Sequence, residues 1–377
     1  MRHPTGSNGE PAQPLIRFDK VTKKYGTLTA IQDLSLDIYP GEFFALLGPS
    51  GCGKTTLMRM IAGFEDASAG SVLLNGQDMS GVPANRREVN MMFQSYALFP
   101  HMSVEKNIAF GLKQDGWDKK ATRERVDEML SLVQMETLAG RKPHQLSGGQ
   151  RQRVALARSL AKKPKVLLLD EPLGALDRKL REETQFELVD LQERLGLTFV
   201  IVTHDQEEAM TVATRIAVMK GGQLLQVDEP ARIYEHPANA FIADFVGNVN
   251  MFDITIADTS GELLSCSWDN GDTPMVIRPQ PEDGYSVGDQ AKMVLRPEKV
   301  HITKAQPDAA HNINMAPGEI EEISYTGATS TYLVRLNSGA LMRVQEANRM
   351  LLDRRELTWG DKVWLHWRAG ACVTVRD

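Results

Sequence analysis

Two segments of this sequence combine residue types that bind phosphate groups. The first has the pattern Gly-x4-Gly-Lys-[Ser/Thr] and comprises Gly48, Pro49, Ser50, Gly51, Cys52, Gly53, Lys54, Thr55 and Thr56. Amides of such a loop cradle phosphates, the lysine reaches the terminal ones, and the threonine hydroxyl suits Mg²⁺. The second comprises Ser147, Gly148, Gly149 and Gln150. Its glycines allow close approach of a ligand, and its serine begins a helix whose amides face an anion, so we predict two phosphate-facing elements.

Polar residues that follow apolar runs supply the other half of a phosphoryl-transfer site. Asp170 and Glu171 follow one run, so Asp170 can hold Mg²⁺ and Glu171 can orient or deprotonate the attacking water. Gln94 and His204 follow two further runs. Because ligand crevices open where strands of an α/β sheet end, we expect Gln94 to contact metal or water and His204 the γ-phosphate or water. Solvated carboxylates and a structural histidine are the alternatives.

An α/β sheet would position these residues, and the first two thirds of the chain alternate strand-like and helix-like segments as such a sheet requires. Strands are predicted at residues 42–47, 166–170 and 199–203, and helices at 55–62 and 180–195. A further helical stretch, residues 104–139, is polar on one side and predicts an inserted helical subdomain within about residues 93–165. Residues 1–14 are rich in proline, glycine and polar groups and predict a flexible tail.

The pattern changes after about residue 245, where short alternating strands such as 253–256 and 331–335 are separated by turns at 269–272 and 337–339. A weak repeat relates Gly288-Asp289, followed by Arg296, to Gly360-Asp361, followed by Arg368, with an offset of 72 residues. We predict an all-β domain, residues 247–377, made of two small OB-like barrel units, with chance similarity as the alternative. Three tryptophans of this domain could form a ligand platform or pack the barrel: Trp359, Trp364 and Trp367.

Composition limits the class of protein. The 377 residues carry a formal net charge of −6, whereas a protein that mainly grips nucleic acid is normally basic. No apolar stretch approaches the roughly 20 residues of a membrane-spanning helix. The three cysteines, Cys52, Cys266 and Cys372, are widely spaced and form no metal or disulfide pattern, which favours reduced thiols in a cytoplasmic protein.

In their order along the chain, these motifs resemble those of the ATP-binding cassette (ABC) ATPases, with an ATPase domain at residues 15–246. The resemblance implies ATP and Mg²⁺ as cofactors, with Thr55, Gln94 and Asp170 at the metal and with Glu171, His204 and Gln94 as catalytic residues. It also implies that Tyr25 stacks on adenine and that Asp177 lies at the seam between two copies of the chain. Ser147, Gly148, Gly149 and Gln150 would meet the ATP held by the second copy. Each nucleotide would then be sandwiched in a homodimer.

The β domain indicates the subtype. A cassette followed by two small β units resembles the importer ATPases for sugars, polyamines, iron and sulfate, and residues 247–250 and 294–298 resemble the polyamine type, above all the putrescine importers. The resemblance implies an ATPase at the cytoplasmic face of the inner membrane, with two integral-membrane permease subunits, which would meet residues 95–102, and a periplasmic or extracellular solute-binding protein. A sugar, iron or sulfate importer and a soluble ABC ATPase of DNA repair or ribosomes are the alternatives. A regulatory role of the β domain is a further possibility.

Overall fold

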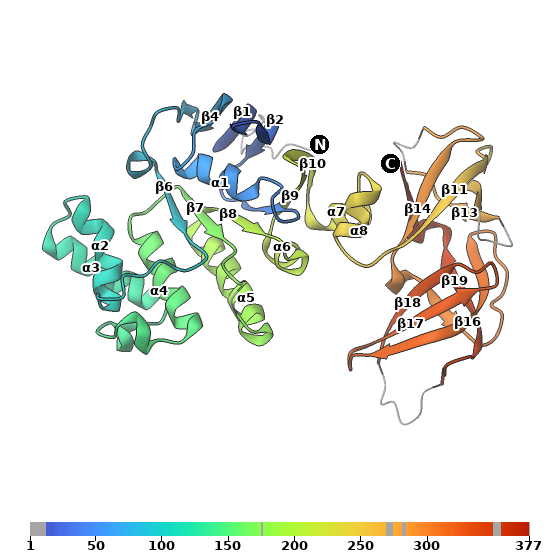
Figure 1. The fold of residues 1–377 in the computed structure, drawn as a ribbon. Coiled ribbons are helices and arrows are strands. Elements are labelled where there is room, and N and C mark those ends of the chain that lie inside the picture. The colour runs from blue at the N-terminus through green and yellow to red at the C-terminus, as the bar shows by residue number, and fades with distance from the viewer. Residues whose placement is uncertain (1–12, 175, 269–273, 281–283, 350–355, 377) are drawn as a thin grey trace. The chain divides into compact units, whose positions relative to one another are not determined.

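The computed structural model describes residues 13–174, 176–268, 274–280, 284–349 and 356–376. The chain divides into two compact units, residues 1–230 and 231–377, and each is described by itself (Figure 1). Among the described residues, no helix combines the length and the apolar character needed to cross a membrane.

A six-stranded sheet forms the centre of the first unit, in the order β10-β9-β3-β8-β7-β6. Its strands are β3 (Phe43–Leu47), β6 (Val89–Met92), β7 (Val166–Asp170), β8 (Thr198–Thr203), β9 (Arg215–Lys220) and β10 (Gln223–Asp228). All neighbours pair in parallel except β10, which is antiparallel to β9. Parallel strands covered on both faces are apolar throughout, and β3 and β8 are buried along their whole length.

A second, antiparallel sheet has the order β2-β1-β4-β5. It consists of β1 (Ile16–Tyr25), β2 (Leu28–Ile38), β4 (Ala69–Leu74) and β5 (Gln77–Asp78). Side chains of helix α1 (Lys54–Ala62) pack into a core that both sheets share. The phosphate loop, defined as residues 48–56, therefore begins at a strand of one sheet and ends in a helix anchored to both.

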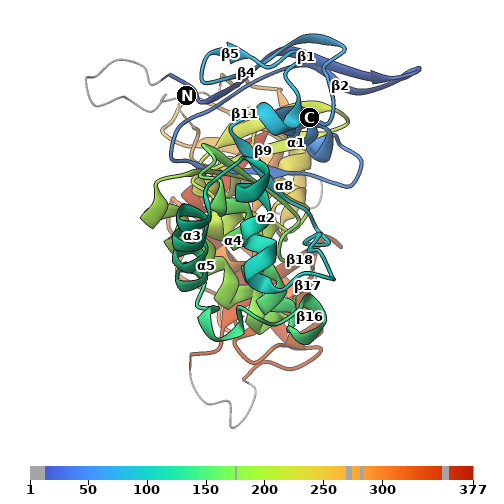
Figure 2. The ribbon, with the colours of Figure 1, turned by 90° about the vertical axis from the view of Figure 1, so that its left-hand side faces the viewer.

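Helices α2 (Val104–Gln114), α3 (Lys119–Leu132) and α4 (Gly148–Ala161) pack on one another, away from the antiparallel sheet (Figures 1 and 2). They lie within the range predicted for the helical subdomain. Asn107 of α2 is fully buried, and its amide bonds the backbone of Phe99, Met102 and Ser103, which fixes the loop before α2. Two further helices, α5 (Arg178–Leu195) and α6 (Gln206–Val212), follow β7 and β8.

The second unit begins with helices α7 (Pro230–Glu235) and α8 (Ala240–Phe245), so the structural division lies before the predicted domain start at residue 247. A buried side chain accounts for this difference. Arg296 is 2% exposed, and its guanidinium donates to the carbonyls of Tyr234, Ala243 and Gly247 at 2.9 to 3.1 Å. Such hydrogen bonds join residues far apart in the sequence, and the local pattern does not reveal them.

Two five-stranded antiparallel sheets form the rest of this unit, in the orders β13-β12-β11-β14-β20 and β15-β19-β16-β17-β18. Their strands are β11 (Asn250–Asp258), β12 (Leu264–Trp268), β13 (Met275–Ile277), β14 (Gln290–Leu295), β15 (His301–Thr303), β16 (Ile313–Tyr325), β17 (Thr329–Leu336), β18 (Leu341–Ala347), β19 (Lys362–Arg368) and β20 (Cys372–Val375). The turn predicted at 337–339 joins β17 to β18, whereas the one at 269–272 lies outside the described residues.

The topology confirms the predicted repeat. Asp289 and Asp361 close equivalent turns, because their carboxylates accept from the amides of Ser286 and Thr358 at 2.9 and 2.8 Å. The glycines before them have φ values of 92° and 78°. The units are not independent barrels, however, because each repeat gives its last strand to the other sheet: β15 pairs with β19, and β20 pairs with β14. Side chains of both sheets form one core.

Candidate functional site

Close packing shapes the phosphate loop between β3 and α1. A Cβ atom on Gly48 would lie 2.4 Å from the Met219 carbonyl oxygen, and one on Gly53 would lie 2.3 Å from Cδ1 of Ile31. Gly53 also has a φ of 105°, in the left-handed region. Glycine is therefore required at both positions for steric reasons, and the loop is anchored to β9 and β2.

Lys54 holds its charge inside this loop. Its Nζ atom donates to the carbonyls of Gly48 at 2.6 Å and Pro49 at 3.0 Å, and the side chain is buried. Thr55 and Thr56 follow in the first turn of α1, whose amides lack partners within the helix. An ammonium group and a helix N-terminus together suit the binding of an anion such as phosphate.

Three of the predicted catalytic residues meet at the carboxyl ends of neighbouring strands. The Glu171 carboxylate accepts a hydrogen bond from Nε2 of Gln94 at 2.9 Å and lies 3.1 Å from Nδ1 of His204. These residues follow β7, β6 and β8, respectively. The Glu171 side chain is partly exposed, so a water molecule can reach it. The arrangement fits a general base held in place by two neighbours.

Asp170 supplies the second carboxylate of this site. Burial raises the pKa of Asp170, and the adjacent Glu171 raises it further, whereas Arg59 and Lys54 lower it. A carboxylate in such surroundings is stabilised by a nearby cation. Gln94 donates through its nitrogen, which leaves its amide oxygen free for a cation. The oxygen donors of Thr55, Gln94 and Asp170 are of the type that Mg²⁺ prefers, so the residues fit this ion.

A partly buried hydrogen-bond network that begins at Thr203, next to His204, contains functional candidates that the sequence did not reveal. The Thr203 hydroxyl donates to Glu208 and accepts from the Asp205 amide at 2.9 Å. Asp205 caps α6 and pairs with Arg181 at 2.9 Å. Arg181 in turn donates to the carbonyl of Leu176 at 3.4 Å, and thus connects the strand end of His204 with the turn before Asp177. The spacing Asp205-x-x-Glu208 is typical of a helix start, and it is the sequence pattern that could have indicated this network.

The segment Ser147–Gln150 begins α4 with reciprocal hydrogen bonds. The Ser147 hydroxyl accepts from the Gln150 amide at 3.2 Å, and the Gln150 side chain accepts from the Ser147 amide at 3.0 Å. A Cβ atom on Gly149 would lie 3.3 Å from the side chain of Leu180 in α5, whose N-cap is Asp177. The segment therefore lies beside the start of α5. Among the described residues of the chain, no hydrogen bond joins it to the phosphate loop.

Tyr25 lies at the end of β1 with 43% of its surface exposed. The ammonium group of Lys23 lies 5.0 Å from the centre of its ring, and Lys23 pairs with Glu65 at 2.8 Å. The same β1–β2 hairpin carries Ile31, which packs against Gly53 of the phosphate loop. An exposed, positioned ring on this hairpin is therefore available for stacking.

Comparisons with known proteins agree with this geometry. Residues 31–174 match the family model of the ABC transporter domain, and residues 293–375 match that of the TOBE domain. The chain is 51% identical over 375 residues to the putrescine transport ATP-binding protein PotG of Escherichia coli K12, which covers 99% of this chain and 98% of that protein. It is 46% identical to the spermidine/putrescine import ATP-binding protein PotA of Rubrobacter xylanophilus, with 98% and 96% covered.

Two solved structures each resemble more than half of the chain. CbiO1 of Clostridium perfringens, part of the ABC transporter complex CbiONQ, has a TM-score of 0.54 at 30% identity and covers 58% of this chain and 90% of its own. The dimeric, post-hydrolysis state of the ATP-binding cassette MJ0796, bound to ADP and Pi, has a TM-score of 0.51 at 32% identity and covers 57% and 98%.

Proposed function

Because the chain belongs to the ABC transporter ATP-binding proteins, in the group that contains the putrescine and spermidine import proteins, we propose that it hydrolyses ATP to power uptake of a polyamine, with putrescine as the first candidate. One observation carries the proposal for ATP hydrolysis. The Glu171 carboxylate contacts both Gln94 and His204 at the carboxyl ends of three consecutive strands, β8-β7-β6, on one side of the phosphate-loop strand β3.

In the proposed reaction, Lys54 and the loop amides bind the β- and γ-phosphates. Glu171 accepts a proton from the attacking water, while Gln94 and His204 orient the Glu171 carboxylate. Thr55, Gln94 and Asp170 would hold Mg²⁺, which would supply positive charge that balances the phosphate oxygens. Charge placed in advance around the γ-phosphate is the main source of catalysis in such sites.

A second copy of the chain completes the proposed site. Ser147, Gly148, Gly149 and Gln150 contact the ATP bound by the partner, Asp177 lies at the seam, and Tyr25 stacks on the adenine of its own subunit's ATP. The free amides at the start of α4, a helix of 14 residues, support the phosphate contact. The dimeric state of the similar cassette MJ0796 supports the pairing.

Uptake requires partners in the membrane, and we place the chain at the cytoplasmic face with two permease subunits and an external solute-binding protein. The names of the polyamine-import relatives support this assignment. Residues 95–102 are the proposed permease contact. Arg158 fixes this segment by donating to the carbonyls of Tyr96 and Ala97 at 3.0 and 2.8 Å.

Reconstitution tests the proposal. The chain is assembled in vesicles with its two permeases, and ATPase activity and solute uptake are measured with solute-binding protein loaded with putrescine, spermidine, a sugar, ferric iron or sulfate. We expect stimulation by putrescine or spermidine. Stimulation by another solute alone would replace the polyamine assignment with that importer class, and stable association with ribosomes or DNA instead of permeases would contradict transport.

A further inference from the structure

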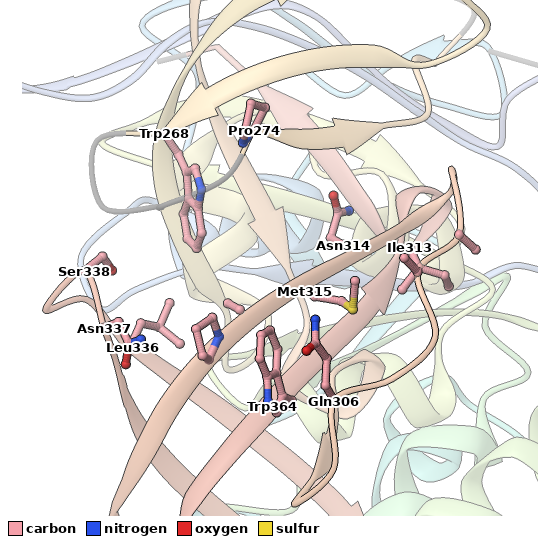
Figure 3. A pocket seen from close by; sticks show the side chains of 14 residues that line it. Trp268, Pro274, Gln306, Ile313, Asn314, Met315, Leu336, Asn337, Ser338 and Trp364 are labelled. Carbon is pink, nitrogen blue, oxygen red and sulfur yellow. The ribbon is translucent and has the colours of Figure 1, made fainter.

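A pocket of about 400 Å³ opens in the second unit, beside strands β12, β16 and β19 (Figure 3). Its size lies within the usual range of small-molecule sites, roughly 300–1,000 Å³. Trp268 of β12 and Trp364 of β19 project toward it from two sides (Figure 3). The pocket lies far along the chain from every residue of the proposed ATP site, and the proposed function leaves it unused.

The indole of Trp268 is held in place before any ligand arrives. It is buried and makes edge-to-face contacts with Phe252 and Trp367, with ring centres 5.0 and 6.4 Å apart. Trp364 is only half-buried, because Val363, Leu365 and Trp367 take the core-facing positions of β19. Aromatic walls that are fixed by packing favour binding, since little side-chain entropy is lost when a ligand docks.

Hydrogen-bonding groups without protein partners lie at the same pocket. Among the described residues, no hydrogen bond is made by the side-chain amides of Gln306 and Asn337, both of which line the pocket and are exposed. Asn314 differs from these two residues. Its side-chain amide accepts from the Val276 amide at 2.7 Å and donates to the Val276 carbonyl at 2.8 Å. Each free amide offers donors and an acceptor to a ligand.

The described lining of the pocket disfavours several ligand classes. None of the fourteen described residues that line it is acidic or basic. A phosphate or another oxyanion would lose its hydration without meeting a cation. A diamine would meet no carboxylate among these fourteen residues as it loses its hydration, and contact with indole rings offsets only part of that cost. Uncharged ligands avoid this cost.

We propose that this pocket binds an uncharged ring compound with hydrogen-bonding substituents, a sugar or a nucleoside, whose flat face packs on the indoles of Trp364 and Trp268 and whose edge bonds Gln306 and Asn337. The apolar walls and the two rings match the face of such a ring. The free amides match its hydroxyl or amide groups.

The test uses the full-length chain with 5-fluorotryptophan at its five tryptophans, observed by ¹⁹F NMR and assigned by single Trp→Phe substitutions. The probes are glucose, galactose, maltose, uridine and adenosine, with glucose 6-phosphate, UMP and putrescine as charged counterparts. We expect at least one uncharged probe to shift the signals of Trp268 and Trp364 saturably and to bind at least tenfold more tightly than its charged counterpart. The class of the binding probe distinguishes a sugar from a nucleoside.

Two variants and one control sharpen the result. Trp364→Ala should weaken binding of that probe at least tenfold, and Asn337→Asp, which adds charge with little change of shape, should weaken it as well. Trp359→Ala, at an exposed tryptophan outside the pocket lining, should bind normally. The proposal is overturned if no uncharged probe shifts both signals at 20 mM, or if charged counterparts bind equally well. ATPase activity does not enter the test, so its outcome is independent of the proposed function.

Discussion

At the scale of single residues, one strained position directs the carboxylate that we propose as the general base. Glu171 has a φ of 44°, a conformation that costs a non-glycine residue on the order of 1–3 kcal/mol. Its amide donates to the carbonyl of Val202 at 3.0 Å, which ties the turn to β8. The strain is therefore held by the sheet, and it turns the carboxylate toward Gln94 and His204.

This geometry predicts the behaviour of Glu171→Gln. Glutamine has the same shape and keeps a hydrogen-bonding side chain beside Gln94 and His204, but it cannot accept the proton of the attacking water. We expect ATP binding to persist while turnover falls by about 10²–10⁴-fold, the usual worth of a general base. The variant should also accumulate as a dimer closed on ATP. Steady-state ATPase assays and size-exclusion chromatography with Mg-ATP measure the two effects.

Glu182→Gln is a suitable control for this experiment. Glu182 is an exposed residue of α5 that pairs with Arg178 at 3.1 Å. Its ATPase rate should equal that of the unmodified chain. Hydrolysis by Glu171→Gln at a rate close to normal would show that another group accepts the proton.

Cys52 predicts a chemical test of the phosphate loop. Its side chain is 2% exposed, and its sulfur lies 3.8 Å from Nζ of Lys54. Burial raises the pKa of Cys266 to about 11 and that of Cys372 to about 12, so these thiols are poorly reactive. We expect alkylation to be slow, to occur at Cys52 when the loop opens, to inhibit ATPase activity, and to be suppressed by Mg-ATP. Mass spectrometry measures the labelling, and equal labelling with and without Mg-ATP would contradict it.

At the scale of elements, local sequence patterns were sufficient to predict those strands and turns whose conformation depends only on residues close together in the sequence. The apolar runs of β3, β7 and β8 were predicted within one residue at each end, because buried parallel strands need no alternation. The Gly-Asp turns of the repeat were also visible, since each glycine takes a positive φ that other residues avoid.

Pairings between strands that are far apart in the sequence could not be predicted, because local patterns carry no information about them. Strands β15 and β20 have three and four residues, and nothing within them indicates that each joins the sheet of the other repeat. Arg181 likewise bonds Asp205 and Leu176, and no local pattern indicates that these residues lie close together in the fold. Gln94, Glu171 and His204 were found because strand ends of one sheet gather at one edge.

Glu208 of α6 predicts a pH dependence of stability. Burial raises the pKa of Glu208 to about 7 in the folded chain, against its ordinary value of 4.5, while the hydrogen bond from Thr203 acts in the opposite direction. The neutral form is thus favoured by folding, and stability falls as the pH rises from about 4.5 to 7, by on the order of 3 kcal/mol, and then levels off. Asp205, Arg181 and His204 are the other ionisable groups nearby.

Glu208→Gln should remove this part of the pH dependence. Urea unfolding of the first unit, followed at pH 5 and pH 8 by the circular dichroism of its helices, should show a smaller loss of stability for the variant than for the unmodified chain over that interval. Glu207→Gln, at an exposed neighbour in the first turn of α6, should leave the pH dependence unchanged. Parallel pH curves for the unmodified chain and Glu208→Gln would show that Glu208 titrates normally.

At the scale of the whole molecule, the two repeats of the second unit use one equivalent arginine differently. Arg296 and Arg368 occupy equivalent positions after the Gly-Asp turn of their repeats: Arg296 directly follows β14, and Arg368 is the last residue of β19. Arg368 is exposed. Arg296 is buried under the segment that leads from the first unit into the second, and the ring of Tyr234 lies 4.0 Å from its guanidinium carbon. The arginine at this position therefore binds the segment that contains α7 and α8 in the first repeat, whereas its counterpart in the second repeat is exposed.

Arg296→Lys tests this attachment, with Arg368→Lys as its matched control. Lysine keeps the charge but cannot donate at once to the carbonyls of Tyr234, Ala243, Gly247 and Asn248. We expect the free energy of unfolding of the second unit to fall by about 2–4 kcal/mol in Arg296→Lys. In Arg368→Lys it should change by less than about 0.5 kcal/mol. Urea unfolding followed by tryptophan fluorescence reports on this unit, which holds four of the five tryptophans. Equal losses in both variants would show that α7 and α8 are held by other contacts, and that the unit's boundary does not depend on Arg296.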